Sequence, residues 1–389
     1  YKHHTTYYDW TFDNILNYSA VFGDHSIAAT LLYGASERKE NYTSALARKF
    51  LRLSLGFDAL ESGTDQFVES NAWSEALLYQ MARVNYKWKD RYLLTATVRR
   101  DGFSGFGENN KTAIFPSVAL GWVMSEEEWF KIGWINNLKL RGGWGISGNQ
   151  TSRYKSLSKT NVDPGYVFGD GGETENAQRV TTMGNSDLKW EKTKSHNLGI
   201  DFSFFQSWLS GTLEIYKKVG EDQVIQKTLA PSTGANYVAI NDGDVNNSGW
   251  ELSVNVNPIH GKDWNWGISF NTAKNYNKVK NAGEELSVTW SDYVNGTLVR
   301  NGRSINSFYA YRFKGLNDEG LPTFYGESEK DEDGVAIITT QEEAFDAAFV
   351  YAGRREPTLS GGFSTNVRFK RLTMNANFSF ALGNKMRLN

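Results

Sequence analysis

The sequence predicts an all-β protein whose antiparallel strands form a transmembrane β-barrel, and three observations support this prediction. First, residues of alternating polarity recur along the 389-residue chain, as expected of strands whose two faces meet different surroundings. Second, aromatic residues make up 14% of the chain, with 13 Trp and 19 Tyr, which is typical of aromatic girdles at two membrane interfaces. Third, short and long connections alternate, as in barrels with turns on one side of the membrane and loops on the other.

The hairpin RVNYKWKDRYLLTATVRRDG (residues 83–102) shows the alternation most directly. Every second residue of each strand is apolar, and a tight turn falls at Lys89-Asp90. In a soluble sandwich such an apolar face packs inward, whereas in a membrane barrel it points to lipid and the other face lines water. Along the whole chain the second face is rich in Ser, Thr, Gly and Asn, where a soluble sandwich would carry more Lys and Glu. This composition favours the membrane barrel.

Twelve strands are predicted from this pattern, and it is clearest in NLGIDFSF, WELSVNV and LTMNANFSF. The predicted strands are 13–21, 26–35, 75–88, 91–101, 114–123, 137–147, 191–205, 208–218, 247–257, 263–275, 357–369 and 371–382.

The connections between these strands fall into two classes. Short turns are expected at 22–25, 89–90, 206–207, 258–262 and 370, and long extracellular loops at 36–74, 148–190, 219–246 and 276–356. The segment 124–136 is predicted to be a brief amphipathic helix on the short-turn side. A closed barrel of this kind has an even number of strands with both chain ends on the short-turn side. Further strands are therefore expected on both sides of these twelve, and we expect the chain to be a fragment or a processed product.

Composition excludes several classes of function. The formal net charge is −2, so no basic excess points to nucleic acid, and there is no Cys for disulfides or thiol chemistry. Mean hydropathy is −0.52, and no apolar run approaches the roughly 18 residues of a transmembrane helix. No nucleophile–base pair or phosphate-binding loop is found, so we expect a protein that is not an enzyme and has no catalytic residues.

A metal or cofactor is not expected either. The segment NDGDVNNSG places Asp242, Asp244 and Asn246 at alternating positions, loosely like a calcium loop. The closing Glu of such a loop is missing, because position 253 is Ser. Calcium in this external loop is kept as the alternative to a Gly-rich loop that enters a strand.

Two groups of residues are candidates for contacts. Aromatic side chains in the predicted loops can stack on a sugar ring, bury against a partner or pack within the loops. They are Trp73, Phe103, Phe106, Tyr154, Tyr166, Phe168, Tyr237, Trp290 and Tyr293. Charged side chains on the polar strand face are predicted to face the lumen, where they pair across strands or contact a plug. They are Arg83, Arg99, Arg141, Asp201, Glu214 and Glu251.

Several segments resemble the SusC/RagA-like TonB-dependent transporters of the Gram-negative outer membrane. They include KDRYLLTATVRRDGFSGFGENNKTAIFPSVALGWVMSEEEWF, LKLRGGWGISGNQ and NSDLKWEKTKSHNLGIDFSFFQSWLSGTLEIYKK. In the last of these, Ser186 stands where the family usually has Pro. The segments NDGDVNNSGWELSVN and EPTLSGGFSTNVRFKRLTMNANFSFALGNKMRLN resemble later strands of the family. The likeness covers nearly the whole chain in order.

This resemblance implies a fold and a function. Residues 1–389 would be the C-terminal part of a 22-stranded barrel, roughly strands 10 to 21, with the plug domain absent from this chain. The transporter would lie in the outer membrane of a Gram-negative bacterium with its loops facing the exterior. It would import a large nutrient, an oligosaccharide or alternatively an oligopeptide. Its partners would be a SusD-like surface lipoprotein, TonB acting through the missing plug region, and outer-membrane lipid. A secreted all-β glycan-binding module is the alternative from another class, since Trp and Tyr are abundant.

Overall fold

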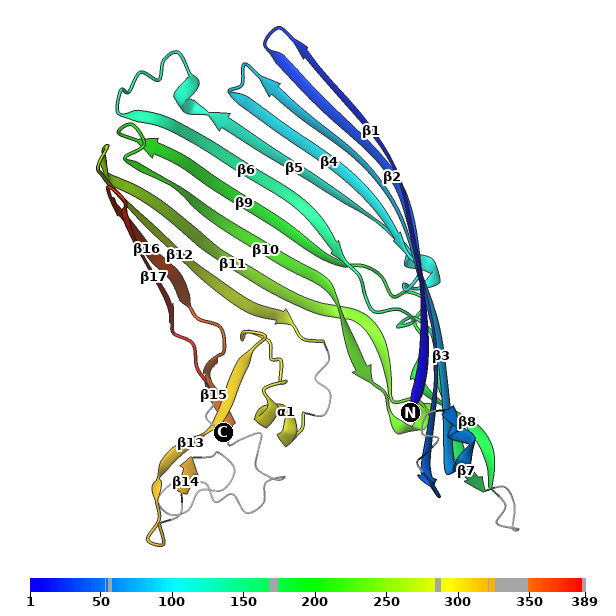
Figure 1. Ribbon diagram of the computed structural model, residues 1–389. Helices are drawn as coiled ribbons and strands as arrows, with labels where there is room; N and C mark the ends of the chain where they lie inside the picture. Colours follow the sequence, from blue (N-terminus) through cyan, green and yellow to red (C-terminus); the bar gives the residue numbers. More distant parts are fainter. Residues whose placement is uncertain are drawn as a thin grey trace.

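A computed structural model of the chain describes residues 1–52, 54, 58–167, 174–283, 288–320, 322–325 and 349–386. Twelve of its strands lie side by side in one antiparallel sheet, each paired with its neighbours (Figure 1). In sheet order they are β1 (Lys2–Phe22), β2 (His25–Phe50), β3 (Gly63–Trp88), β4 (Tyr92–Phe103), β5 (Thr112–Val123), β6 (Ile135–Asn149), β9 (Glu191–Phe204), β10 (Leu209–Thr228), β11 (Tyr237–His260), β12 (Trp264–Asn281), β16 (Leu359–Phe369) and β17 (Leu372–Leu382). The twelve predicted strands and their antiparallel order are confirmed.

Several strands run further on the loop side than predicted. The region 36–74 is not one long loop, because β2 continues to Phe50 and β3 begins at Gly63. The region 219–246 is likewise mostly strand, because β10 ends at Thr228 and β11 begins at Tyr237. Sequence alternation misses these extensions because they lack one apolar and one polar face: residues 36–44 are polar throughout, and Phe67-Val68 and Val224-Ile225 put apolar side chains on both faces. The backbone ladder continues without such an alternation to mark it.

The short turns are confirmed, and their backbone shows why they are tight. Lys89 and Asp90 both have positive φ, 52° and 51°, as the two central residues of a type I′ turn require, and Arg91 N–H closes the turn on Trp88 O at 3.0 Å. Gly23 has φ 59° in the turn between β1 and β2, where glycine carries no steric penalty.

The predicted helix in 124–136 is wrong. The structure has a single 3₁₀ turn, η4 (Met124–Glu126), followed by separate turns in which Phe130 N–H donates to Glu127 O and Ile135 N–H to Ile132 O. So short a segment provides few propagating bonds to offset helix nucleation. The indole of Trp122 instead donates to the Glu127 carboxylate at 2.9 Å and holds the chain close to the strand.

Two of the predicted loops contain secondary structure of their own. Region 148–190 holds the hairpin β7 (Lys159–Val167) and β8 (Thr174–Met183). Region 276–356 holds α1 (Trp290–Asn295) and a small sheet of β13 (Ser307–Leu316), β14 (Pro322–Tyr325) and β15 (Phe349–Arg354). Three further 3₁₀ turns are η2 (Leu60–Ser62), η3 (Glu108–Asn110) and η5 (Pro231–Thr233).

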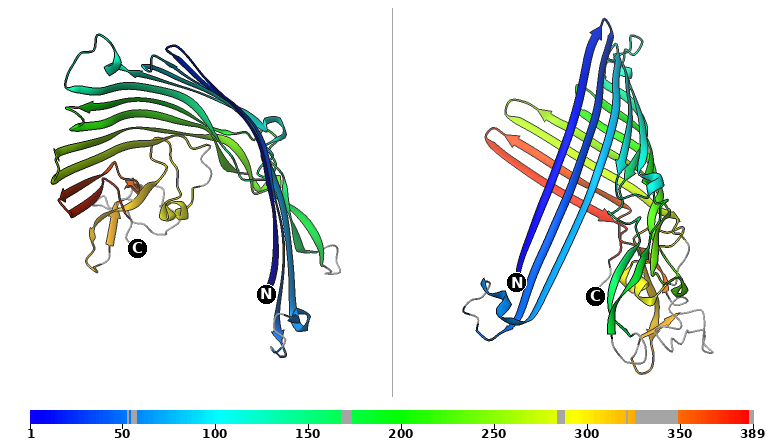
Figure 2. Two further views of the ribbon diagram at one scale, coloured as in Figure 1. Left: turned by 45° about the horizontal axis from the view of Figure 1, so that its top comes forward. Right: turned by 90° about the vertical axis from the view of Figure 1, so that its right-hand side faces the viewer.

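The sheet is strongly curved, and its apolar side chains are not covered by the rest of the chain. Figure 2 shows the sheet bending from β1 to β17, with the elements of region 276–356 beneath one end. Large apolar side chains of the strands remain exposed, such as Leu120 at 59%, Leu198 at 61% and Phe378 at 62%. Buried apolar residues gather instead at the loop end of the strands. None of the described helices is long and apolar enough to span a membrane.

Candidate lumen and loop site

The polar faces of neighbouring strands lie on the same side of the sheet. On β3 and β4, Arg83 Nε donates to Thr97 Oγ1 at 3.1 Å, and Thr95 Oγ1 donates to Asn85 Oδ1 at 2.8 Å. Such cross-strand pairs form only between side chains that share a face. The face opposite the exposed apolar residues is therefore the polar one, as predicted.

A charged cluster spans three neighbouring strands on this face. Arg141 on β6 donates through Nε to Asp201 Oδ1 on β9 at 3.0 Å, and through Nη1 to Glu214 Oε2 on β10 at 2.8 Å. Glycine at position 199 of β9 makes this reach possible, since it lies between Arg141 and Glu214 in the strand register. A Cβ at this position would lie 2.8 Å from the Arg141 Cζ atom. These three charges pair across strands, which is one of the two roles expected of them.

Glu251 remains beside this cluster without an ion pair among the described residues. It lies directly opposite Glu214 in the register of β10 and β11. The carboxylates of Glu214 and Glu251 repel each other, and of these two Arg141 contacts only Glu214. The cluster of Arg141, Asp201, Glu214 and Glu251 therefore carries a formal excess of negative charge.

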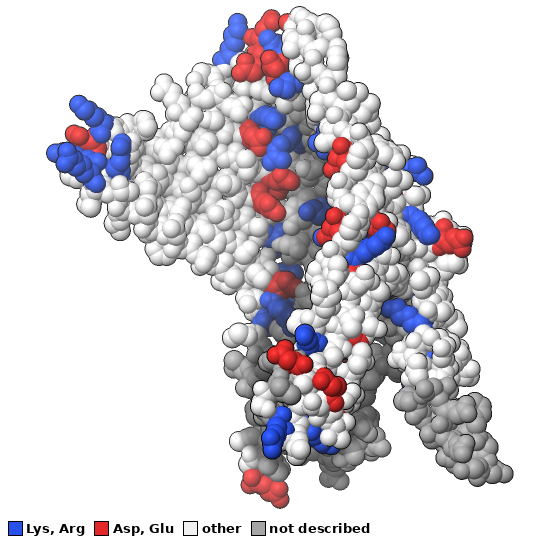
Figure 3. Space-filling model, turned by 45° about the vertical axis from the view of Figure 1, so that its right-hand side comes forward, with Lys and Arg blue, Asp and Glu red and all other residues white. Residues whose placement is uncertain are grey.

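Arg99 belongs to a second charged group, on β1, β3 and β4. It pairs with Asp101 on its own strand at 2.8 Å and lies over the Tyr79 ring at 5.1 Å. The Tyr79 hydroxyl in turn donates to Asp13 on β1 at 2.6 Å. Figure 3 shows acidic and basic side chains next to one another in a band along a hollow of the molecule, flanked by broad areas without charge. Contact of any of these side chains with a plug stays a prediction.

A compact aromatic core lies where the loops leave the strands. Phe106 is 1% exposed and Phe103 is 3% exposed, and the ring of Phe106 lies 4.8 Å from that of Trp190. Leu188 is fully buried in the same cluster. We call Phe103, Phe106, Phe115, Leu188, Trp190 and Ala239 the loop core. Burial favours loop packing over contact with a substrate or lid for both Phe103 and Phe106. Sequence reasoning missed Leu188 and Trp190, which lie in the conspicuous segment SDLKWEK.

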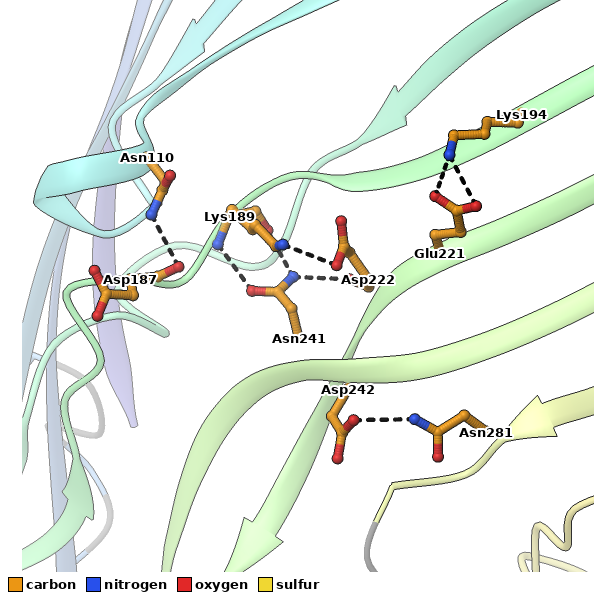
Figure 4. A network of polar contacts seen from close by, with 9 residues as sticks. All are labelled: Asn110, Asp187, Lys189, Lys194, Glu221, Asp222, Asn241, Asp242 and Asn281. Carbon is orange, nitrogen blue, oxygen red and sulfur yellow. Dashed lines mark hydrogen bonds and ion pairs between the residues drawn. The ribbon is translucent and has the colours of Figure 1, made fainter.

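Hydrogen bonds and an ion pair join the chain segments around the loop core (Figure 4). The Asn241 side chain accepts from Lys189 N–H at 2.9 Å and donates to the carbonyls of Lys189 and Asp222 at 2.9 and 2.7 Å. Lys189 Nζ also pairs with the Asp222 carboxylate at 2.9 Å. Asn110 donates to the carbonyl of Asp187 at 3.0 Å. These bonds tie the connections before β5 and β9 to each other and to the loop-side ends of β10 and β11.

The segment NDGDVNNSG takes part in this structure as strand rather than as loop. It lies within β11, and the Asp242 carboxylate accepts a hydrogen bond from Asn281 at 3.0 Å. In the part of the chain that the structure describes, no three His, Cys, Asp or Glu side chains come together in a way that could hold a metal ion. Calcium binding at Asp242, Asp244 and Asn246 stays a prediction.

The helix α1 anchors a second small core. Tyr293 is fully buried, with its ring stacked on Phe349 at 4.6 Å and edge-on to Tyr309 at 5.5 Å. Trp290 donates through its indole to the Tyr311 hydroxyl at 3.2 Å. A capping box starts the helix, and hydrogen bonds from the Thr289 N–H and hydroxyl lower the pKa of the Asp292 carboxyl.

The remaining predicted aromatics lie in different surroundings. The Arg153 guanidinium lies 3.4 Å from the centre of the Trp73 ring, and the Tyr154 hydroxyl bonds both the N–H and the carbonyl of Ser74. Tyr237 is half-buried at the start of β11. Tyr166 lies in β7 with its side chain outside the described part, and Phe168 lies outside the described residues. The role of the whole aromatic set in binding stays a prediction.

A polar cavity of about 670 Å³ opens between the segments that Tyr154 joins. Ser104 Oγ accepts from Ala76 N–H, and Ser158 Oγ accepts from Gly184 N–H, both at 2.9 Å. Glu108 and Lys111 at its edge are exposed. Several of its lining hydroxyls thus bond within the loops, and Glu108 and Lys111 are the charged side chains of its lining.

Comparison with known proteins gives consistent matches. The family described as TonB dependent receptor-like, beta-barrel, matches residues 1–384. TonB-dependent receptor P3 of Formosa agariphila is 31% identical over 96% of this chain and 38% of its own length. TonB-dependent receptor SusC of Bacteroides thetaiotaomicron is 34% identical over 62% of this chain and 25% of its own length. The chain thus spans less than two-fifths of the length of these curated relatives.

Among solved structures, that of the RagAB peptide transporter superimposes with a TM-score of 0.82 at 24% identity. The alignment covers 98% of this chain and 42% of that chain. The outer membrane transporter YddB from Escherichia coli gives a TM-score of 0.52 at 11% identity over 94% of this chain and 40% of that chain. These likenesses show the fold, and they agree with the observed strand order.

Proposed function

The chain belongs to the TonB-dependent receptor-like β-barrel family, and from this premise we propose that it forms part of the wall of an outer-membrane importer. The transporter takes up a large nutrient with energy delivered through TonB. This assignment replaces the alternative of a secreted glycan-binding module, which would have to bury its apolar face within the chain.

The observation that carries the proposal is the separation of the two sheet faces. One face exposes large apolar side chains, and the other carries paired charges and small polar residues. Lipid is the surrounding that suits the first face, and a water-filled lumen or a plug suits the second. Short turns on one side and long connections on the other support the proposal that the loops face the cell exterior.

The proposed substrate is an oligosaccharide. The polar face is rich in Ser, Thr and Asn, whose side chains hydrogen-bond to neutral hydroxyl-bearing ligands. The cavity at Glu108 and Lys111 lies at the loop end, where an incoming ligand meets the barrel first. The alternative substrate is an oligopeptide, since the RagAB structure is described as that of a peptide transporter.

The proposed partners follow from the family. A SusD-like surface lipoprotein covers the loop end, TonB acts through a plug region, and further strands of the same protein close the barrel. Their place in the sheet is open, because β1 and β17 each pair with a single neighbour among the described strands. Exposed strand edges are not tolerated in hydrocarbon, where each unsatisfied backbone group costs on the order of several kcal/mol.

The experiment that tests transport is uptake by the native bacterium with and without the complete gene. Labelled oligosaccharides and labelled oligopeptides of similar mass are offered in parallel, with a TonB-deficient strain as the energy control. We expect oligosaccharide uptake that requires both the gene and TonB. Uptake of peptides alone would select the alternative, and extraction of the intact protein without detergent would refute the membrane assignment.

A further inference from the structure

Along the short-turn rim of the sheet, cations at one end have carboxylate partners among the described residues and cations at the other end do not. Near β3 to β6 the cations are matched: Lys89 lies 3.9 Å from Asp24, and Arg91 lies 3.4 Å from Glu127. Hydrogen bonds with Tyr92 and Trp122, together with Arg91, hold the pKa of Glu127 below its ordinary value. Lys89 and Arg91 on this part of the rim thus have carboxylate partners within the chain.

The other end of the rim is different. The turns after β11 and β16 carry Lys262, Lys370 and Arg371, all exposed, with Asp263 as their one carboxylate. A hydrogen bond of 2.7 Å from Lys370 N–H to the Asp263 carbonyl ties the two turns together. No ion pair within the described part of the chain involves any of the three cations. A mainly basic group projects at the far left of Figure 3, at the tips of these turns. We call Lys262, Lys370 and Arg371 the basic corner.

Apolar side chains lie directly below the basic corner on the outward face. Trp264 and Phe369 are cross-strand partners with ring centres 4.4 Å apart, 48% and 38% exposed. Leu372 and Met374 continue the same face on β17, at 71% and 65% exposure. Aromatic rings of this kind sit at the level of lipid headgroups, and the aliphatic residues beyond them sit at the level of acyl chains. From the short-turn rim toward the middle of the sheet, the cations therefore come first, the aromatic pair second and the aliphatic side chains third.

We propose that the basic corner binds the headgroup of an anionic phospholipid in the leaflet that faces the short turns. The phosphate lies among the three cations, and the acyl chains lie on Trp264, Phe369 and Leu372. Charge complementarity carries this assignment, since three cations face one carboxylate here, whereas Lys89 and Arg91 have carboxylate partners. It rests on the proposed function only in that this face of the sheet meets a membrane.

The number of cations sets how strongly the basic corner prefers an anionic lipid to a zwitterionic one. Each Lys or Arg near an anionic membrane surface strengthens binding about fivefold, so three give on the order of a hundredfold, reduced by Asp263. A neutral zwitterionic lipid gains only the acyl-chain contacts. We therefore expect phosphatidylglycerol to bind at least about tenfold more tightly than phosphatidylcholine with the same acyl chains.

The test uses the complete transporter in detergent and measures retained lipid by native mass spectrometry during titration with each of these two lipids. The triple variant K262Q/K370Q/R371Q removes the three positive charges of the basic corner. The matched control K2Q/K159Q/K280Q removes the same charge from exposed positions on the loop side. A second variant, W264A/F369A, removes the aromatic pair and keeps the charges.

The expected result is a preference for phosphatidylglycerol in the wild type and the control that disappears in the corner variant. The aromatic variant should bind both lipids more weakly while keeping the preference. An unchanged preference in the corner variant, equal binding of both lipids by the wild type, or displacement of the lipid by inorganic phosphate alone would overturn the proposal. A transporter that binds phosphatidylglycerol in this way yet imports neither substrate class would refute the proposed function and leave this inference standing.

Discussion

The sheet and the loop core use the same kinds of residue in opposite ways. On the strands, Leu198 is 61% exposed and Leu372 is 71% exposed, whereas in the loop core Leu188 is fully buried and Phe106 is 1% exposed. The loop core is thus stabilised by contacts within the chain, as in a water-soluble protein. The apolar face of the sheet gains its stabilisation from surroundings outside the chain. Substitutions in the two regions should therefore respond differently to the removal of lipid.

The largest loss of stability is expected from Trp190→Ala in the loop core. Truncating a buried aromatic leaves a cavity among Phe103, Phe106 and Phe115 and costs about 3–5 kcal/mol of local stability. Hydrogen exchange of the connections clamped by Asn241 should rise, and it should do so equally in detergent and in bilayers. The control Trp144→Ala, on the exposed face at 39%, should leave this exchange unchanged. Equal exchange in both variants would contradict the role of the loop core.

The second effect tests the sheet with two neighbouring residues. Leu198 faces outward and Asn197 faces the polar side, where its amide donates to Glu214 at 3.4 Å. Leu198→Arg should lower the free energy of unfolding in bilayers by about 2–4 kcal/mol, since it places a cation in hydrocarbon. Asn197→Arg should cost much less, because it adds a cation beside carboxylates. Urea titration of the complete transporter in vesicles measures both, and equal costs would refute the assignment of the two faces.

The third effect concerns the way Arg141 crosses β9. Gly199→Leu should displace the guanidinium from Glu214 while leaving the backbone ladder intact, since the blocked atom is the end of a flexible side chain. Loss of this charged hydrogen bond costs about 1–2 kcal/mol, at the low end because the side chains are about 30% exposed. In the background Arg141→Gln the same substitution should cost much less. A double-mutant cycle on unfolding measures this coupling, and simple additivity of the two costs would contradict it.

The sequence predicts a strand where one face is apolar and the other polar. It does not predict contacts between residues that are far apart in the sequence. The alternation of NLGIDFSF located β9, because lipid and lumen impose opposite polarities on its faces. The same rule could not find residues 36–44 of β2, where both faces are polar. It located Arg141, Asp201 and Glu214 on one face, yet the register that joins them is a property of three paired strands. The sequence offers Phe106 as a candidate for substrate or lid contact and does not show its burial, because its partner Trp190 lies 84 positions away and no local pattern reveals the pair.

The smallest effect lies in the second loop-side core and depends on pH. Hydrogen bonds from Thr289 lower the pKa of Asp292 from its ordinary value of 3.8, so the charged carboxylate is the form that the fold stabilises. Its contribution is fully present above pH 3.8 and is lost as the pH falls through the lower pKa of the folded state. Asp292→Ala should therefore reduce the local stability of α1 by about 0.5–1 kcal/mol at pH 7. Wild type and variant should converge as the pH falls below 3.8, because the wild-type carboxyl then loses its charge as well. Hydrogen exchange of the α1 amides at several pH values, corrected for intrinsic rates, measures this difference. A difference that stayed constant down to the lowest pH would show that the contribution of Asp292 does not depend on its charge.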